Sequence, residues 1–245
     1  GAAAWGPDSL PSPSNIRMFL DADTPASLTL VGSKVSAWAN QAASGLASLD
    51  QATDANRPTN GATRNGRNVM TFASNSGLSR KGGAGTLVPA NAMTAFLVAA
   101  PAGSQPWGGG FFSGVQNTGS DDNGGQAAFA LRCSTDSSQR LMFMQDGGSQ
   151  NVNGGTNSWS VYTVTHNGSS GTLRQDGAQI LAYGCGNTAT QYFGWSHSGY
   201  YTSGAWDYSS GMVGDVGAVV IYNTVLSAGD RDTVEAALKT RWGTP

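Results

Sequence analysis

The feature that most constrains this sequence is a long apolar run near its C-terminal end, followed at once by a helix signal. Residues 212–222 are rich in β-branched side chains and contain no proline, which predicts a strand buried on both faces. Ser227 and Asp230 have the spacing of a helix capping box. The helix that follows repeats apolar residues on one face, at Val234, Ala237, Leu238 and Trp242. This C-terminal segment therefore predicts a larger β-structure, in which the strand is buried and on which the apolar face of the helix packs.

The rest of the chain alternates short β-type runs with turns rich in glycine, asparagine and serine. Glycine occurs 35 times among 245 residues, and only 11% of the residues are charged. This profile is typical of one large all-β sandwich rather than two small domains. The net charge of −2, with the basic residues scattered, argues against nucleic acid as a partner. No apolar run reaches the length of a membrane span.

Apolar runs predict most of the strands. Before the terminal segment they lie at residues 16–20, 28–31, 35–38, 69–72, 93–100, 111–115, 126–132, 140–145, 158–166, 172–175, 178–183 and 191–194. The run 158–166 alternates, which predicts one covered face and one wetter face. Asp176-Gly177 joins two of the runs and is a strong hairpin signal, because both turn residues need positive φ.

Two stretches lack this pattern. Residues 1–15 carry three prolines after Trp5 and predict an extended lead-in. Residues 41–66 are polar, and we expect coil with little regular structure there. The single domain is therefore expected to span residues 16–245.

Both ends of the chain resemble a known family. Ile221-Tyr222-Asn223, then Leu226-Ser227, then Trp242-Gly243 is similar to the end of laminin-G-like domains of the concanavalin A-like superfamily, of bacterial or phage type. The family's opening is resembled by Asp21-Ala22, Val35-Ser36-Ala37-Trp38, Arg57-Pro58 and a strand ending in Phe72. The resemblance implies a concanavalin A-like jelly-roll sandwich of two antiparallel sheets with a short C-terminal helix. It leaves activity open, because this fold carries lectins, adhesion modules, virion proteins, glycosidases and lyases.

A glycosidase is not favoured by the carboxylates of the chain. Most glycoside hydrolysis needs two carboxylates on either side of the scissile bond. Glu235 is the sole glutamate and lies four residues before Lys239 in the terminal helix, where an exposed ion pair is the expected role. The aspartates Asp21 and Asp23, like the Asp121-Asp122 pair, are expected in turns.

A polysaccharide lyase is the stronger enzymatic alternative. β-Elimination from a uronic acid needs a base, an acid and a group that neutralises the carboxylate, and His, Tyr and Arg can fill these roles. His197 is close in sequence to Tyr200 and Tyr201, and Arg174 lies on a predicted strand. However, residues 179–181 read Gln-Ile-Leu, whereas jelly-roll alginate lyases have Gln-Ile-His.

The segment 195–208, which we call the aromatic segment, is the best candidate binding site. Protein sites for sugars pair an aromatic surface with polar side chains that bind hydroxyl groups. Glycine and serine separate the aromatic residues of this segment, and no apolar period suggests burial. The candidate ligand-binding residues are Trp195, His197, Tyr200, Tyr201, Trp206, Asp207 and Tyr208, with Trp107 from the loop 101–125, because loops at one end of a sandwich can be neighbours.

Two further groups are candidates for a metal and a disulfide. Asp121 and Asp122 offer oxygen ligands of the kind that Ca²⁺ prefers, although no complete ligand set can be identified. No cofactor is required by the predicted function. Cys133 and Cys185 either pair or remain two thiols, depending on the compartment.

The sequence thus predicts non-catalytic binding of a polysaccharide or surface glycoconjugate by a lectin-like or adhesion module. The composition is typical of an extracellular, cell-surface or virion protein of bacterial or phage origin. The alternatives are a polysaccharide lyase or glycosidase on the same fold, and a purely structural virion or surface-layer domain with other virion or surface proteins as partners.

Overall fold

Two long antiparallel strands, β20 (Gly214–Tyr222) and β8 (Met93–Pro101), form the centre of the protein. The computed structural model describes residues 5–46, 48–79, 92–101, 158–184 and 213–245 with their side chains. It describes the backbone alone of residue 80 and of the strands within 110–151 and 192–206. All nine residues of β8 are buried, and in β20 only Asp215 is partly exposed. The predicted central strand is confirmed.

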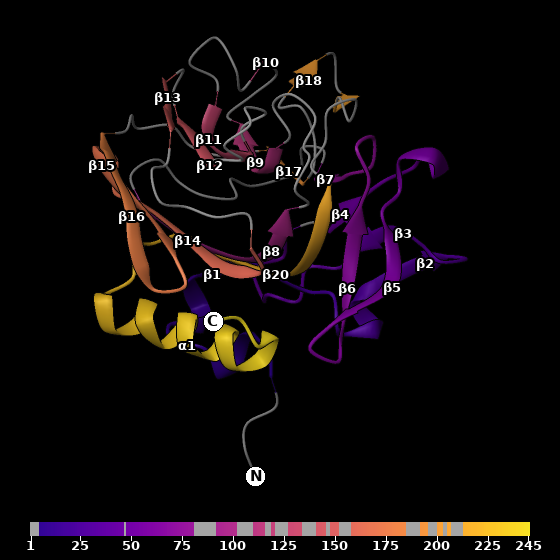
Figure 1. Ribbon diagram of the computed structural model, residues 1–245, viewed down its shortest axis with the longest axis horizontal. Coiled ribbons are helices and arrows are strands. Elements are labelled where there is room, and N and C mark those ends of the chain that lie inside the picture. Colours follow the sequence, from indigo (N-terminus) through magenta and orange to yellow (C-terminus); the bar gives the residue numbers. More distant parts are fainter. Residues whose placement is uncertain are drawn as a thin grey trace.

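The first layer extends from this pair in both directions (Figure 1). On one side follow β14 (Ser160–His166), β15 (Ser170–Gln175) and β16 (Ala178–Gly184). On the other side, β1 (Ile16–Asp21) pairs with one half of β20 and β6 (Arg67–Phe72) with the other half.

The second layer lies opposite and is again antiparallel (Figure 1). Its strands pair in the order β4 (Leu49–Asp50), β7 (Leu78–Arg80), β17 (Tyr192–Trp195), β9 (Gly110–Val115), β11 (Ala127–Cys133), β12 (Leu141–Gln145) and β13 (Gly148–Asn151). The hairpin of β2 (Leu28–Val31) and β3 (Lys34–Trp38) adjoins β4. Strand β5 (Thr59–Arg64) pairs with β6 and β3, and it therefore joins the layers. The predicted all-β antiparallel sandwich is confirmed.

The single α-helix of the described residues, α1 (Ala228–Trp242), packs on the outer side of the first layer, against β14 and β8 (Figure 1). The Ser227 side chain caps it by accepting a hydrogen bond from the backbone N–H of Asp230 at 3.1 Å. Val234, Leu238 and Trp242 are fully buried. The predicted capped helix, lying flat on the body, is confirmed. No helix in the described part of the chain is long and apolar enough to cross a membrane.

The expectation of one wetter face on the strand at 158–166 was wrong. All seven residues of β14 are buried. The reason is that α1 lies against this strand on the outer side of the layer, so the polar residues of the alternation are covered as well. The Asp176-Gly177 hairpin is confirmed, with φ of 50° and 90° at the two turn residues.

The expectation of coil between residues 41 and 66 was also wrong. The stretch contains β4, a 3₁₀ turn η4 (Asp54–Asn56) and β5. Strand β5 turns into β6 at Asn65 and Gly66, which have positive φ of 48° and 75°. Asn-Gly between paired strands is a hairpin signal of the same kind as Asp176-Gly177.

The expectation of an extended lead-in was wrong, because its prolines begin the 3₁₀ turns η1 (Pro7–Ser9) and η2 (Pro13–Asn15). A further 3₁₀ turn, η3 (Pro25–Ser27), precedes β2. Leu10 is buried in the core. Tyr222, at the end of β20, donates a hydrogen bond to the carbonyl oxygen of Pro11 at 3.1 Å. Burial raises the pKa of the Tyr222 hydroxyl well above its usual range, and the nearby Asp230 adds to this shift.

Candidate functional site

Backbone pairing brings together the two loops from which the candidate ligand-binding residues come. Outside the two layers, β10 (Gly119–Ser120), β18 (Tyr200–Thr202) and β19 (Ala205–Trp206) form a separate three-stranded sheet. Tyr201 is paired with Trp206 on one side and with Gly119 on the other. Tyr200 is paired with Ser120, the residue before Asp121. The expectation that the loop 101–125 neighbours the aromatic segment is therefore met at this point.

For the remaining predicted site residues, the structure describes only the backbone of Trp195. Trp195 is the last residue of β17, at the entrance to the aromatic segment. His197, Asp207, Tyr208 and Trp107 lie outside the described residues. The contribution of each of these side chains therefore stays a prediction.

The metal and disulfide predictions fall on the same part of the chain. Asp121, Asp122 and Cys185 lie outside the described residues, and Cys133 ends β11 with only its backbone described. Within the described residues, no group of three or more side chains is arranged to hold a metal ion. Calcium binding and the disulfide stay predictions.

The expectation of an exposed Glu235–Lys239 pair was wrong. Glu235 is only 3% exposed and binds Arg174 through two contacts, Nε to Oε1 at 3.0 Å and Nη2 to Oε2 at 3.2 Å. Lys239 instead donates to the carbonyl oxygen of Asp176 at 3.3 Å. Because α1 lies against the β15–β16 hairpin, its glutamate points at that hairpin and not at solvent. Glu235 and Arg174 thus hold the helix in place.

Asp21 and Asp23 form a second ionic cluster. Asp23 lies in a turn, as expected, whereas the turn expectation was wrong for Asp21. Asp21 ends β1 and is fully buried. Its Oδ2 accepts hydrogen bonds from Trp5 Nε1 at 2.5 Å and from Arg241 Nε at 2.7 Å, and its Oδ1 accepts from the backbone N–H of Asp23 at 2.8 Å. The carboxylate therefore accepts three hydrogen bonds from donors of the protein itself.

Asp23 is held in the same way. Its Oδ2 lies 2.8 Å from Arg67 Nη1 and 3.4 Å from Arg241 Nη2. Its Oδ1 accepts from the backbone N–H of Asn68 at 2.9 Å. An acid–base pair needs one carboxylate that can give a proton to a substrate and a second that can take one. In this cluster both carboxylates are bound by arginine side chains and backbone N–H groups, and the contacts tie the lead-in, β1, β6 and α1 together.

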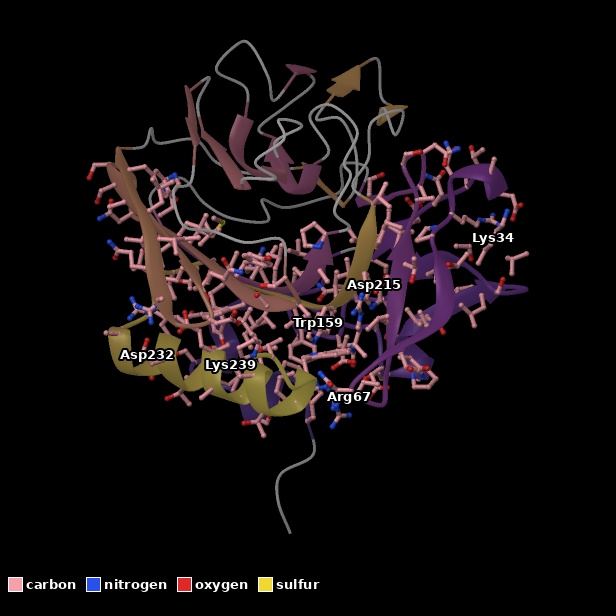
Figure 2. All side chains as sticks on the ribbon, viewed as in Figure 1. Lys34, Arg67, Trp159, Asp215, Asp232 and Lys239 are labelled. Atoms are coloured by element: carbon pink, nitrogen blue, oxygen red, sulfur yellow. The ribbon has the colours of Figure 1, made fainter. Side chains whose placement is uncertain are left out.

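A third ionic contact joins the β5–β6 hairpin to the central strand. Arg64 binds Oδ2 of Asp215 through Nε at 2.9 Å and Nη2 at 2.7 Å, and Thr71 donates to Oδ1 of the same carboxylate at 2.7 Å. The Arg64 guanidinium also lies 5.9 Å from the ring centre of Trp159. Figure 2 shows Asp215 and Trp159 between β6 and α1.

Comparison with known proteins gives likeness in structure only. No family model matches the sequence, and no curated protein matches it. Domain 4 of AbnA, a GH43 extracellular arabinanase from Geobacillus stearothermophilus solved with arabinotriose, has 11% identity and a TM-score of 0.59, over 90% of this chain and 98% of that domain. A GH54 α-L-arabinofuranosidase has 12% identity and a TM-score of 0.65, over 85% of this chain and 51% of the enzyme.

A third structure is the ligand-binding domain of botulinum neurotoxin serotype D with N-acetylneuraminic acid, at 12% identity and a TM-score of 0.52, over 94% of this chain and 54% of that one. The chain spans about half the length of the arabinofuranosidase and of the toxin domain. At these identities the likeness shows the fold, a β-sandwich, and nothing finer.

Proposed function

We propose that this protein binds a polysaccharide or surface glycoconjugate without cleaving it, and that the aromatic segment makes the contact. The observation that carries the proposal is the pairing of β18 with β19 and β10, which gathers Tyr200, Tyr201 and Trp206 beside the loop that leads to Asp121. The sandwich that presents them is proposed to be of the laminin-G-like, concanavalin A-like type. Its place is outside the cell, on the cell surface or on a virion.

The register of this small sheet suits a sugar. Positions directly opposite each other in an antiparallel pair lie on the same face, about 5 Å apart. Positions 201 and 206 therefore share one face, and positions 120 and 200 share the other. Two neighbouring aromatic positions on one face can offer a surface for the C–H groups of a pyranose ring.

The neighbours in structure add weight to the choice of ligand. The AbnA domain was solved with arabinotriose and the neurotoxin domain with N-acetylneuraminic acid. Sandwiches of this shape thus hold both neutral and acidic sugars in other proteins. That this chain also binds a sugar is our proposal.

The absence of cleavage is proposed from the state of three described carboxylates. Asp21, Asp23 and Glu235 are each bound by arginine within the protein. Arg174, which a lyase could use to neutralise a uronate, is bound to Glu235. These side chains serve the fold, which favours a binding role over a hydrolase or a lyase.

A glycan array tests the proposal with wild type, Trp206→Ala and Tyr200→Ala, and with Leu30→Ala as control, because Leu30 is an exposed residue on β2. We expect wild type and the control to bind the same glycans and the two aromatic variants to lose that signal. Equal signals from all four proteins would remove the aromatic segment from the proposal. An empty array would favour a structural domain of a virion or surface layer.

The non-catalytic part is tested separately on a panel of polysaccharides, by counting new reducing ends and unsaturated products. We expect neither to rise above the level without protein. A rise that saturates with substrate would establish the lyase or glycosidase alternative instead.

A further inference from the structure

An open depression of about 600 Å³ lies beside the Asp21–Asp23 cluster, between the lead-in, the start of β6 and the last turns of α1. It is lined chiefly by Trp5, Arg67, Ala236, Ala237, Thr240 and Arg241. Figure 1 places α1 and β18 on opposite sides of the molecule, so this depression is separate from the aromatic segment. Figure 2 shows Arg67 beside the C-terminal end of the helix.

The depression exists because small residues face it from the helix. Ala236, Ala237 and Thr240 leave room where longer side chains would reach across. Its opposite wall is the indole of Trp5, which packs on Phe19 with 5.6 Å between ring centres. The hydrogen bond to Asp21 fixes the orientation of that indole. The walls are therefore preformed, as ligand sites usually are.

The charged groups of the depression are the guanidinium groups of Arg67 and Arg241, which lie beside the hydroxyl-bearing Ser9 and Thr240 and are held by Asp21 and Asp23. Arg67 donates hydrogen bonds from Nε to the carbonyl oxygen of Arg241 and from Nη1 to the carboxylate of Asp23. Arg241 donates hydrogen bonds from Nε to Asp21 and from Nη2 to Asp23. Its guanidinium also lies 5.0 Å from the ring centre of Trp5. Within the described residues, Nη2 of Arg67 and Nη1 of Arg241 make no hydrogen bond. Each arginine keeps unused N–H donors although it is already immobilised.

This arrangement selects the chemistry of a ligand. A guanidinium only donates hydrogen bonds, whereas a sugar hydroxyl both donates and accepts. A carboxylate only accepts, and its two oxygens match the planar N–H fork of arginine. The alanines and the indole complement an apolar surface next to such a carboxylate.

We propose that the depression is a second binding site, specific for an acidic sugar unit such as a hexuronate. Its carboxylate binds the free N–H groups of Arg67 and Arg241, and its C–H groups lie against Ala236, Ala237 and Trp5. Because Asp21 and Asp23 cancel the two positive charges nearby, attraction comes from short-range hydrogen bonds and not from a long-range field. Binding of a single unit is accordingly weak, with a Kd on the order of 1 mM, and it changes little with salt.

The test is an NMR titration of the protein with methyl galacturonoside and, separately, with neutral methyl galactoside. The signals to follow are the indole N–H of Trp5 and the backbone amides of residues 236–240. We expect saturable shifts with the uronide and at least about tenfold weaker binding of the galactoside, which corresponds to the loss of one charged contact.

Two helix variants make the result specific. Ala236→Tyr fills the depression from an exposed position, whereas Thr233→Tyr adds the same side chain at an exposed position one turn earlier, which does not line it and from which the side chain leans toward the N-terminal end of the helix. We expect the first to abolish uronide binding and the second to leave it unchanged. Arg67→Gln is expected to weaken it about fivefold or more, since one of the two forks is lost.

The proposal is overturned if no signal shifts with the uronide, if the galactoside binds equally well, or if Ala236→Tyr binds like wild type. Trp206→Ala separates the two sites of the protein. It is expected to bind the uronide unchanged, and a loss in that variant would place uronide binding at the aromatic segment.

Discussion

At the scale of single residues, several charged side chains in the described part of the chain join segments that are distant in the sequence. Glu235 looks like a surface residue in the sequence, yet it is buried and bound by Arg174. Asp21 is fully buried between Trp5 and Arg241. With charged residues so scarce in the chain, each buried pair carries a definite structural role.

The Arg174–Glu235 pair allows a direct prediction. Arg174→Met leaves the buried carboxylate of Glu235 without its partner, and we expect the free energy of unfolding to fall by about 3 kcal/mol. The double variant Arg174→Met with Glu235→Met removes both charges and should recover most of that loss. Urea denaturation of both variants, with Lys239→Met as control, measures the difference. Equal losses in the single and double variants would contradict a buried pair.

Tyr222 predicts how stability responds to alkaline pH. In the unfolded chain a tyrosine ionises near pH 10, whereas in the folded protein burial raises the pKa of Tyr222. The stability that the neutral hydroxyl contributes is therefore present below about pH 10 and is lost as the pH rises above it.

The variant Tyr222→Phe removes this dependence. At neutral pH we expect its free energy of unfolding to be lower by about 1 kcal/mol, because the hydrogen bond to Pro11 is lost. Above about pH 10 we expect its stability to decline less steeply than that of wild type. Denaturation curves across the alkaline range decide the matter. Parallel declines in the two proteins would show that Tyr222 ionises equally in both states.

At the scale of elements, the sequence predicted those whose apolar pattern is strong. β8, β20, the β15–β16 hairpin and α1 lie where their runs and turn signals placed them. β5 was missed because it is largely exposed and polar, so no alternation marks it. The covered face of β14 was missed because only the docking of α1 buries it.

Of the two groups of residues described at the candidate site, one could be predicted from the sequence and the other could not. The loops of the aromatic segment could be recognised from composition, and β10–β18 pairing places their backbones together. The Asp21 cluster gives no local signal, because Asp21 and Arg241 are 220 residues apart in the sequence. They meet because Arg241, in the last turn of α1, reaches the end of β1 and the lead-in in the folded chain.

The Asp21 cluster predicts a loss that is concentrated in one element. Asp21→Asn places an amide N–H₂ among the donors of Trp5 and Arg241, and leaving buried donors unpaired should cost about 3 kcal/mol. Hydrogen exchange should accelerate most in the last turns of α1. Asp54→Asn, in an exposed ion pair, is the control and should change exchange there little. Uniform acceleration across all elements would contradict a local tie.

At the scale of the whole molecule, the ionic ties of α1 and the small sheet of the aromatic segment lie on opposite sides of the sandwich, and the second proposed site adjoins the ties. One side carries α1, which the Arg174–Glu235 pair and the Asp21 cluster fasten to the first layer (Figure 1). The other side carries β10, β18 and β19, where the proposed glycan contact lies. A rigid body with its ties on one side leaves the opposite side free to vary its loops for a ligand.

The most direct test of the account is a calorimetric titration of the strongest array glycan into wild type and into Trp206→Ala. The account predicts saturable binding by wild type and at least about a tenfold weaker affinity in the variant, since losing a stacked aromatic ring costs about 1.4 kcal/mol or more. Equal affinities in the two proteins, with both fully folded, would contradict it.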